Sequence, residues 1–181
     1  MTASISTIPL EYQIGDPLRS QKLKLVLAES CTGGLVGDRI TNVPGSSDYY
    51  LGSITAYAYE VKQRLLGVSA QTLATAGAVS RECVLEMARG VRMALEGDFP
   101  LESVLGVSIS GIAGPGGGTP QKPVGTVWIG MSAPSGEWAW HFSWKGDRIQ
   151  NKENSAQAAL QLIAWYLQGK IPPENWSGED L

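Results

Sequence analysis

Histidine and cysteine are scarce in this sequence, and their scarcity restricts the chemistry that the chain can perform. The chain of 181 residues contains one histidine, His141. A Ser-His-Asp triad would have to use it, and a histidine-based metal site could recruit only one imidazole. The two cysteines, Cys31 and Cys83, lie far apart and match no metal-binding spacing. Chemistry in this chain must therefore rest mostly on other side chains.

Long apolar runs and blocks of like charge are also missing. No apolar stretch approaches the roughly 20 residues that span a bilayer, and the first residues lack the basic and apolar regions of a secretory signal. The formal charge is -3, from 14 basic and 17 acidic residues, which argues against a nucleic-acid surface. We therefore expect a cytoplasmic protein with two free thiols that binds neither membranes nor nucleic acids.

Length and composition suit one domain with a single hydrophobic core. Hydrophobic residues make up 43% of the chain and charged residues 17%, and neither an internal repeat nor a linker divides it. Residues 1–20 mix Pro, Gly, Ser and Thr without a clear period, so we expect an irregular segment there. Residues 21–169 should form the domain, and residues 170–181 should be a loose tail.

Strand-like and helical patterns alternate along the chain. The predicted strands are rich in β-branched and aromatic residues and cover 23–27, 49–58, 104–109, 124–132 and 137–144. The predicted helices cover 33–43, 60–66, 69–76, 80–97 and 147–167. The last two strands flank a Pro-Ser-Gly turn and are typical of a hairpin. This order predicts a three-layer α/β/α sandwich with a mixed, roughly five-stranded sheet.

The first segment with chemical potential is AESCTGG, residues 28–34, between a predicted strand and a predicted helix. There the Ser30 hydroxyl could face a cleft beside helix N–H groups, which are natural oxyanion donors. A structural turn, with Ser30 as a helix cap, explains the pattern about equally well. Cys31 is the rival nucleophile because a thiol is intrinsically more nucleophilic, although an isolated cysteine is more often a small buried residue.

The second segment is YAYEVK, residues 57–62. A serine nucleophile needs a base, and with histidine scarce a desolvated lysine is the available substitute. Lys62 follows a predicted strand closely enough for a helical turn to direct it back at the strand ends, although a solvated surface lysine is the commoner case. Tyr57 could stack on an aromatic cation or donate a hydrogen bond, or be a half-buried strand residue.

The third segment, SISGIAGPGGG, is a glycine-rich loop after a predicted buried strand. Its backbone could approach a phosphate or carboxylate closely, with Ser110, Gly111 and Gly114 as candidate contacts, or it could be a flexible connection. It lacks the closing Gly-Lys-Ser/Thr of a P-loop. Arg148, in the first turn of the last predicted helix, is a candidate phosphate ligand or a partner in a surface salt bridge.

These segments occur in the same order in the CinA C-terminal domain family, which the chain resembles from about residue 23 to about residue 167. The matching motifs are AESCTGG, the stretch 57–62, GAVS at 77–80, SISGIAGPGGG, KPVGTVW and GDR. The resemblance implies a mixed five-stranded sheet between two helical layers. It also implies hydrolysis of nicotinamide mononucleotide to nicotinic acid mononucleotide and ammonia, without a metal or cofactor.

The resemblance also implies residue roles. Ser30 matches the family's nucleophile, Lys62 its base, Tyr57 its catalytic tyrosine and Arg148 its GDR arginine. The substrate contacts expected are Cys31, Thr32, Gly33, Gly34, Ser110, Gly111, Gly114 and Arg148, with backbone N–H groups of 31–34 holding the oxyanion. We expect an acyl-enzyme route and a homo-oligomer.

The chain departs from the family pattern at three places. Leu27 stands where threonine is usual, Lys152 stands where a second arginine is frequent, and no clear helix precedes the first strand. A catalytically silent nucleotide-binding module remains the alternative, but the presence of Ser30, Tyr57 and Lys62 favours an enzyme. The family name also suggests a role in DNA uptake or damage response, to which the acidic charge balance gives no support.

Overall fold

Strand pairing is the basis of the fold in the computed structural model, which describes residues 8–95 and 97–178. The described strands form one sheet in the order β2-β1-β3-β4-β5. They are β1 (Lys24–Glu29), β2 (Tyr50–Thr55), β3 (Val104–Gly111), β4 (Thr126–Ala133) and β5 (Gly136–Ser143). Strands β2, β1 and β3 run parallel, whereas β4 and β5 form the antiparallel hairpin. The sheet is therefore mixed and five-stranded, as predicted.

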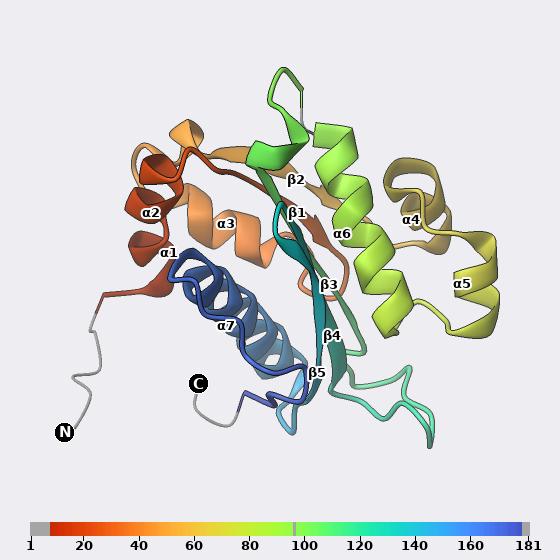
Figure 1. The fold of residues 1–181 in the computed structure, drawn as a ribbon. Coiled ribbons are helices and arrows are strands. Elements are labelled where there is room, and N and C mark those ends of the chain that lie inside the picture. Colours follow the sequence, from red (N-terminus) through yellow and green to blue (C-terminus); the bar gives the residue numbers. More distant parts are fainter. Residues whose placement is uncertain (1–7, 96, 179–181) are drawn as a thin grey trace.

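Helices cover both faces of this sheet (Figure 1). One face carries α1 (Leu10–Gln13), α2 (Gly15–Ser20), α3 (Leu35–Thr41) and α7 (Arg148–Leu167). The other carries α6 (Arg81–Leu95), against which α4 (Tyr59–Leu66) and α5 (Ala70–Thr75) pack. Two short 3-10 turns, η1 (Ser46–Asp48) and η2 (Leu101–Ser103), precede β2 and β3. The predicted three-layer α/β/α sandwich is confirmed. Within the described ranges, no helix is long and apolar enough to cross a membrane.

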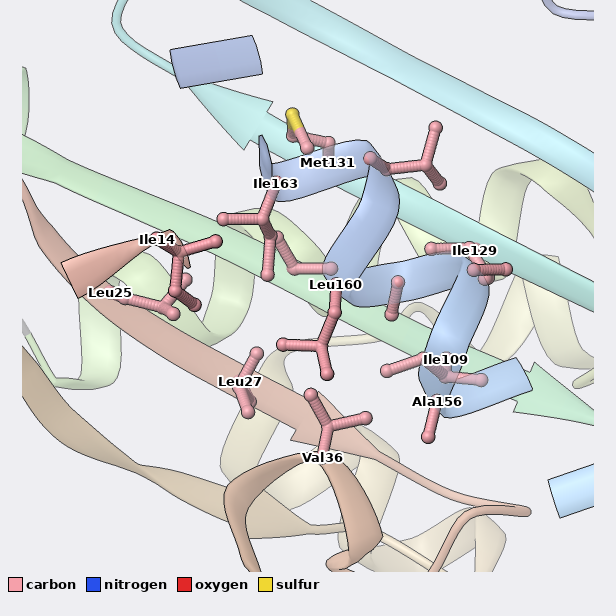
Figure 2. Close-up of a cluster of buried hydrophobic side chains, with 14 of the residues drawn as sticks. Ile14, Leu25, Leu27, Val36, Ile109, Ile129, Met131, Ala156, Leu160 and Ile163 are labelled. Carbon is pink, nitrogen blue, oxygen red and sulfur yellow. The ribbon is translucent and has the colours of Figure 1, made fainter. Parts of the chain in front are cut away.

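The main hydrophobic core lies between α7 and the sheet (Figure 2). Ala156, Leu160 and Ile163 recur at helical spacing on α7 and are fully buried against the sheet. Their neighbours include Ile129 and Met131 of β4 (Figure 2). Burial of each large aliphatic side chain contributes about 1.5–3 kcal/mol. This core fixes α7, and with it the position of Arg148 at its first residue.

Helix α6 packs closely on the opposite face because two strand positions under it are glycines. A Cβ at Gly106 would lie 2.4 Å from the Ala88 carbonyl oxygen, and one at Gly130 would lie 2.6 Å from that of Val84. Both distances are shorter than any van der Waals contact, so a side chain at either glycine would push the helix away. The glycines therefore set the distance between α6 and the sheet.

The N-terminal segment corrects one prediction. Residues 1–7 lie outside the described residues, but 10–13 and 15–20 are helical rather than irregular. Leu10, Ile14 and Leu18 repeat at four-residue spacing and are buried in the main core. Pro17 obscured this pattern, yet it lies in the first turn of α2, where a proline removes no helical hydrogen bond.

The tail after Gly169 corrects a second prediction, because its described part is irregular but not loose. The Trp176 ring packs edge-on against Phe142 of β5 and Trp165 of α7, with centroid distances of 5.4 and 4.7 Å. Glu174 forms an ion pair of 2.7 Å with Arg81 at the start of α6. The tail therefore packs through Trp176 against β5, one of the two outer strands of the sheet.

Candidate active site

Ser30 lies at the carboxyl end of β1, directly before the turn that leads to α3. Its backbone N–H donates to the Ile109 carbonyl of β3 over 2.9 Å, which extends the parallel pairing by one residue. The chain leaves β1 toward β2 through α3 on one face and returns to β3 through α6 on the other. The carboxyl ends of β1 and β3 thus form the crevice in which open α/β sheets usually bind ligands.

Lys62 reaches Ser30 from the neighbouring helix α4. Its Nζ donates to Ser30 Oγ over 2.8 Å and to the Ala56 carbonyl over 2.6 Å, with a longer contact of 3.4 Å to the Tyr57 carbonyl. The side chain is only 1% exposed. Burial lowers the pKa of the Lys62 ammonium, and the thiols of Cys83 and Cys31 raise it by less. The pair predicted from the sequence is therefore in direct contact, although 32 residues separate its members.

A cavity of about 220 Å³ opens beside the Ser30–Lys62 pair. Ser110 and Gly111 at the end of β3 contribute to its wall. Tyr57 and Tyr59 also line it and are 61% and 53% exposed, so their rings stand at its mouth. A larger groove of about 520 Å³ between α4 and α6 is mainly apolar and has Glu86 and Arg89 as its charged lining. The smaller cavity is the candidate active site because it holds the reactive groups.

Glu29 is the functional candidate that sequence reasoning missed. Its carboxylate is fully buried and accepts hydrogen bonds from the N–H groups of Gly34 (3.0 Å), Val36 (3.2 Å) and Gly37 (2.9 Å) at the start of α3. The sequence signal was an acidic residue just before a predicted helix start, where the positive end of the helix dipole favours a negative charge.

These contacts narrow the predicted set of oxyanion donors. The Gly34 N–H is bound to Glu29, and the Gly33 N–H donates to the Ser30 carbonyl over 3.1 Å. Neither is available to a substrate oxygen. Among the described residues, no oxygen accepts a hydrogen bond from the backbone N–H of Cys31 or Thr32, but both N–H groups interact with the Cys31 thiol. Of these two residues only Cys31 lines the cavity, so its N–H is the candidate oxyanion donor.

Arg148 joins three segments at the mouth of the cavity. Its guanidinium donates to the Gly114 carbonyl over 2.6 Å and to Tyr57 Oη over 3.1 Å. Asp147 caps α7 through the backbone N–H groups of Ile149 and Gln150, which fixes the helix start beside the cavity. The glycine-rich loop, the tyrosine segment and α7 thus meet at one edge of the site.

Comparison with known proteins identifies the family. A model of the CinA C-terminal domain matches residues 7–167. The chain belongs to the CinA C-terminal domain family. It is 49% identical over 154 residues to a CinA-like protein from Salinibacter ruber, which covers 85% of this chain and 36% of that protein. The chain spans 36% to 38% of the length of the curated relatives that it matches.

Solved structures of CinA proteins share the fold. A CinA superfamily protein from Klebsiella pneumoniae superposes with a TM-score of 0.81 at 29% identity, covering 88% of this chain and 96% of that one. The competence/damage inducible protein CihA from Agrobacterium tumefaciens gives a TM-score of 0.79 at 30% identity, covering 92% and 99%.

In this CinA domain Cys31 is poorly suited to the role of nucleophile. The thiol lines the cavity, but it is free and buried. Burial raises its pKa to about 12, because the backbone N–H groups and the Lys62 charge offset only part of the desolvation. A raised pKa disfavours the thiolate, which is the nucleophilic form of cysteine. Together with the contact between Ser30 Oγ and Lys62 Nζ, this favours Ser30 over Cys31.

Four predicted contact residues of the CinA motifs do not line the cavity: Thr32, Gly33, Gly34 and Gly114. Thr32 is fully buried, and no described residue hydrogen-bonds its hydroxyl. Gly33 and Gly34 have positive φ angles and shape the turn, while Gly114 meets Arg148 through its carbonyl. Lys152 brings a second cation near this turn, since a Cβ at Gly33 would lie 3.9 Å from its Nζ.

Proposed function

We propose that this CinA-family chain is an amidohydrolase that converts nicotinamide mononucleotide to nicotinic acid mononucleotide and ammonia. The observation that carries the proposal is the buried contact of 2.8 Å between Lys62 Nζ and Ser30 Oγ beside a cavity. A lysine with a pKa lowered by burial can exist as the free amine and accept the serine proton. The family resemblance supplies the substrate.

The chemistry follows an acyl-enzyme route. Lys62 accepts the Ser30 proton as Oγ attacks the carboxamide carbon, and the carbonyl oxygen becomes an oxyanion. The N–H group of Cys31, which lines the cavity, stabilises that oxyanion by about 3 kcal/mol. Lys62 then returns the proton to the departing ammonia. Water, deprotonated by the same amine, attacks the nicotinoyl ester and releases the acid.

The mouth of the cavity supplies groups for the rest of the nucleotide. Arg148 and Lys152 both belong to α7, and their cationic ends suit a phosphate. The exposed rings of Tyr57 and Tyr59 can stack on the cationic pyridinium. In this arrangement the carboxamide enters the cavity toward Ser30 while the phosphate stays at the mouth.

Ammonia release from nicotinamide mononucleotide by the purified, metal-free protein tests this function. We expect turnover by the wild type and none by Ser30→Ala or Lys62→Ala, because each variant lacks one partner of the proton transfer. Circular dichroism should show that both variants remain folded.

Other results would redirect the proposal. Nucleotide binding without ammonia release by the wild type would indicate a catalytically silent binding module. Turnover that survives Ser30→Ala but not Cys31→Ala would identify the thiol as the nucleophile.

A further inference from the structure

The buried carboxylate of Glu29 takes no part in the chemistry described above. It precedes Ser30 in the sequence, is fully buried and does not line the cavity. Its partners are three backbone N–H groups of the α3 start at 2.9–3.2 Å, and no basic side chain of the described residues forms an ion pair with it. Burial of a charged group is unfavourable unless its partners compensate for the lost hydration, so the burial of the Glu29 carboxylate needs an explanation.

Glu29 holds the serine turn at both ends. Its backbone belongs to β1 and lies in register with Thr55 of β2 and Ile109 of β3. Its side chain binds the far end of the turn, where α3 begins. Only residues 30–33 lie between these two anchor points, and among them are Ser30 and Cys31, both of which line the cavity. A shift of the α3 start would therefore move the Ser30 hydroxyl and the Cys31 N–H together.

The same residue also lies next to the anchor of the base. The Glu29 carbonyl accepts a hydrogen bond from the Ala56 N–H over 2.8 Å, and the Ala56 carbonyl accepts one from Lys62 Nζ. Nucleophile and base are thus both tied to one strand end.

The carboxylate also decides which donors a substrate can use. A helix N-terminus ordinarily offers its first N–H groups and a partial positive charge to an anion. In α3 a side chain of the protein occupies that position. The oxyanion must therefore bind beside Ser30 rather than at the helix end.

We propose that Glu29 is a positioning residue, which holds the Ser30 hydroxyl and the N–H group of Cys31 in the geometry of attack by occupying the N-terminus of α3. This inference rests on the proposed Ser–Lys amidohydrolase function. Glu29 touches neither the substrate nor the reacting atoms, so its loss should change the rate of the chemical step and not the affinity for the nucleotide.

The Glu29→Gln variant tests this role. It keeps the size of the side chain but sets an NH₂ group against the α3 N–H donors. We expect kcat for ammonia release to fall by about tenfold or more, because small displacements of reacting groups are costly, while KM stays within about threefold.

Glu86→Gln is the matched control. The Glu86 carboxylate binds the start of α5, accepting from the Ser69 N–H over 2.8 Å and from Thr72 Oγ1 over 2.6 Å. The substitution removes a helix-binding carboxylate that does not line the cavity, so thermal stability should fall while kcat is retained. Equal kcat values for the Glu29 and Glu86 variants would overturn the positioning role.

A second measurement separates this inference from the proposed substrate. Phenylmethylsulfonyl fluoride sulfonylates an activated serine: the Oγ–S bond forms, fluoride leaves and the hydroxyl proton is lost to the base. We expect Ser30, located by mass spectrometry, to react at least about tenfold more slowly in Glu29→Gln than in Glu86→Gln.

If Ser30 is labelled more slowly in Glu29→Gln than in Glu86→Gln but the wild type releases no ammonia, the positioning role is upheld and the proposed substrate is refuted. Equal labelling rates would overturn the role even if ammonia is released. Should Glu29→Gln fail to fold, Glu29→Asp, which keeps the charge but is one methylene shorter, should show the same losses, and normal rates in it would also overturn the role.

Discussion

At the scale of single residues, the Lys62 amine combines deep burial with full use of its hydrogen bonds. Transfer of an ammonium out of water is unfavourable, and hydrogen bonds to oxygen restore only part of the lost hydration. Here the acceptors are the Ser30 hydroxyl and two backbone carbonyls. The free amine is therefore favoured more than in an exposed lysine, while the acceptors keep the side chain aimed at Ser30.

The pH dependence of activity and that of stability should both reflect the titration of Lys62. Burial lowers its pKa in the folded chain below the ordinary 10.5, so kcat/KM should rise with pH through an apparent pKa below that value. Between the folded and unfolded pKa values the unfolded chain binds more protons, so the Lys62 contribution to the unfolding free energy should increase with pH and level off above 10.5.

Rate profiles and urea unfolding across this range would measure both effects. Lys62→Met is the control for stability because it lacks the titrating group. The assignment to Lys62 would be contradicted if the unfolding free energy of Lys62→Met changed with pH as in the wild type. It would also be contradicted if kcat/KM rose with an apparent pKa at or above 10.5.

Part of the candidate site was predictable, because residues of reactive types directly follow strands that were predicted from the sequence. Ser30 stands at a strand end, and Lys62 follows the next strand, so parallel pairing brings the two segments to the same edge of the sheet. Burial of the lysine could not be read from the sequence, because it depends on packing between α4 and α6. The catalytic roles of both residues stay predictions.

The role of Glu29 was hidden for a related reason. A glutamate at the end of a predicted strand has no visible partner in the sequence, since its acceptor oxygens bind backbone N–H groups five to eight residues further along. Almost every residue type has a backbone N–H group, so the sequence does not reveal which of them bind a side chain. The Gly34 N–H is bound to Glu29 and the Gly33 N–H to the Ser30 carbonyl, so neither is free to hold the oxyanion as expected.

At the scale of elements, the contact between α6 and the sheet depends on the absence of side chains at two strand positions. We expect Gly106→Ala to lower the unfolding free energy by about 1–3 kcal/mol, because the new Cβ would lie 2.4 Å from the Ala88 carbonyl oxygen. Urea unfolding would measure the change. Gly116→Ala is the matched control, since no atom of residues 8–95 or 97–178 outside its immediate neighbours lies within 4 Å of its Cβ position. Equal stabilities of the two variants would contradict this account of the packing.

Most elements were predictable because their local signals agree with the tertiary structure. Ser69 and Asp147, the first residues of two predicted helices, accept hydrogen bonds at the starts of α5 and α7, and Gly67 ends α4 with a positive φ. The helices of residues 10–20 escaped prediction because they are very short and contain a glycine and a proline. Helices of that length depend on tertiary contacts, which α1 makes with α7 and α3.

At the scale of the whole molecule, one polar cluster joins three helices of the same layer. Arg39 of α3 donates to Glu11 of α1 over 2.6 Å and to Gln157 of α7 over 2.9 Å. The Arg39 and Glu11 side chains are 22% and 13% exposed. Burial alone would raise the pKa of Glu11, but the hydrogen bond and charge of Arg39 outweigh it and lower the pKa below 4.5.

This ion pair should contribute to stability only above acidic pH. A carboxyl with a lowered folded pKa stabilises the fold above its unfolded value of 4.5, and the contribution is lost as pH falls through the folded pKa. We expect Glu11→Gln to cost about 1 kcal/mol at pH 7 and much less at pH 3, as measured by urea unfolding. A difference of the same size at both pH values would show that Glu11 acts through packing instead.

The packed tail has a consequence for how copies of the protein behave in concentrated solution. An outer strand with free backbone groups is a template for pairing with another chain and for the growth of aggregates. Residues 170–178, beyond the range that the family model matches, place Trp176 over Phe142 of β5 and tie Glu174 to Arg81. Without the tail, that aromatic surface and strand edge would face neighbouring molecules. By covering part of β5, the tail reduces the tendency of neighbouring molecules to associate.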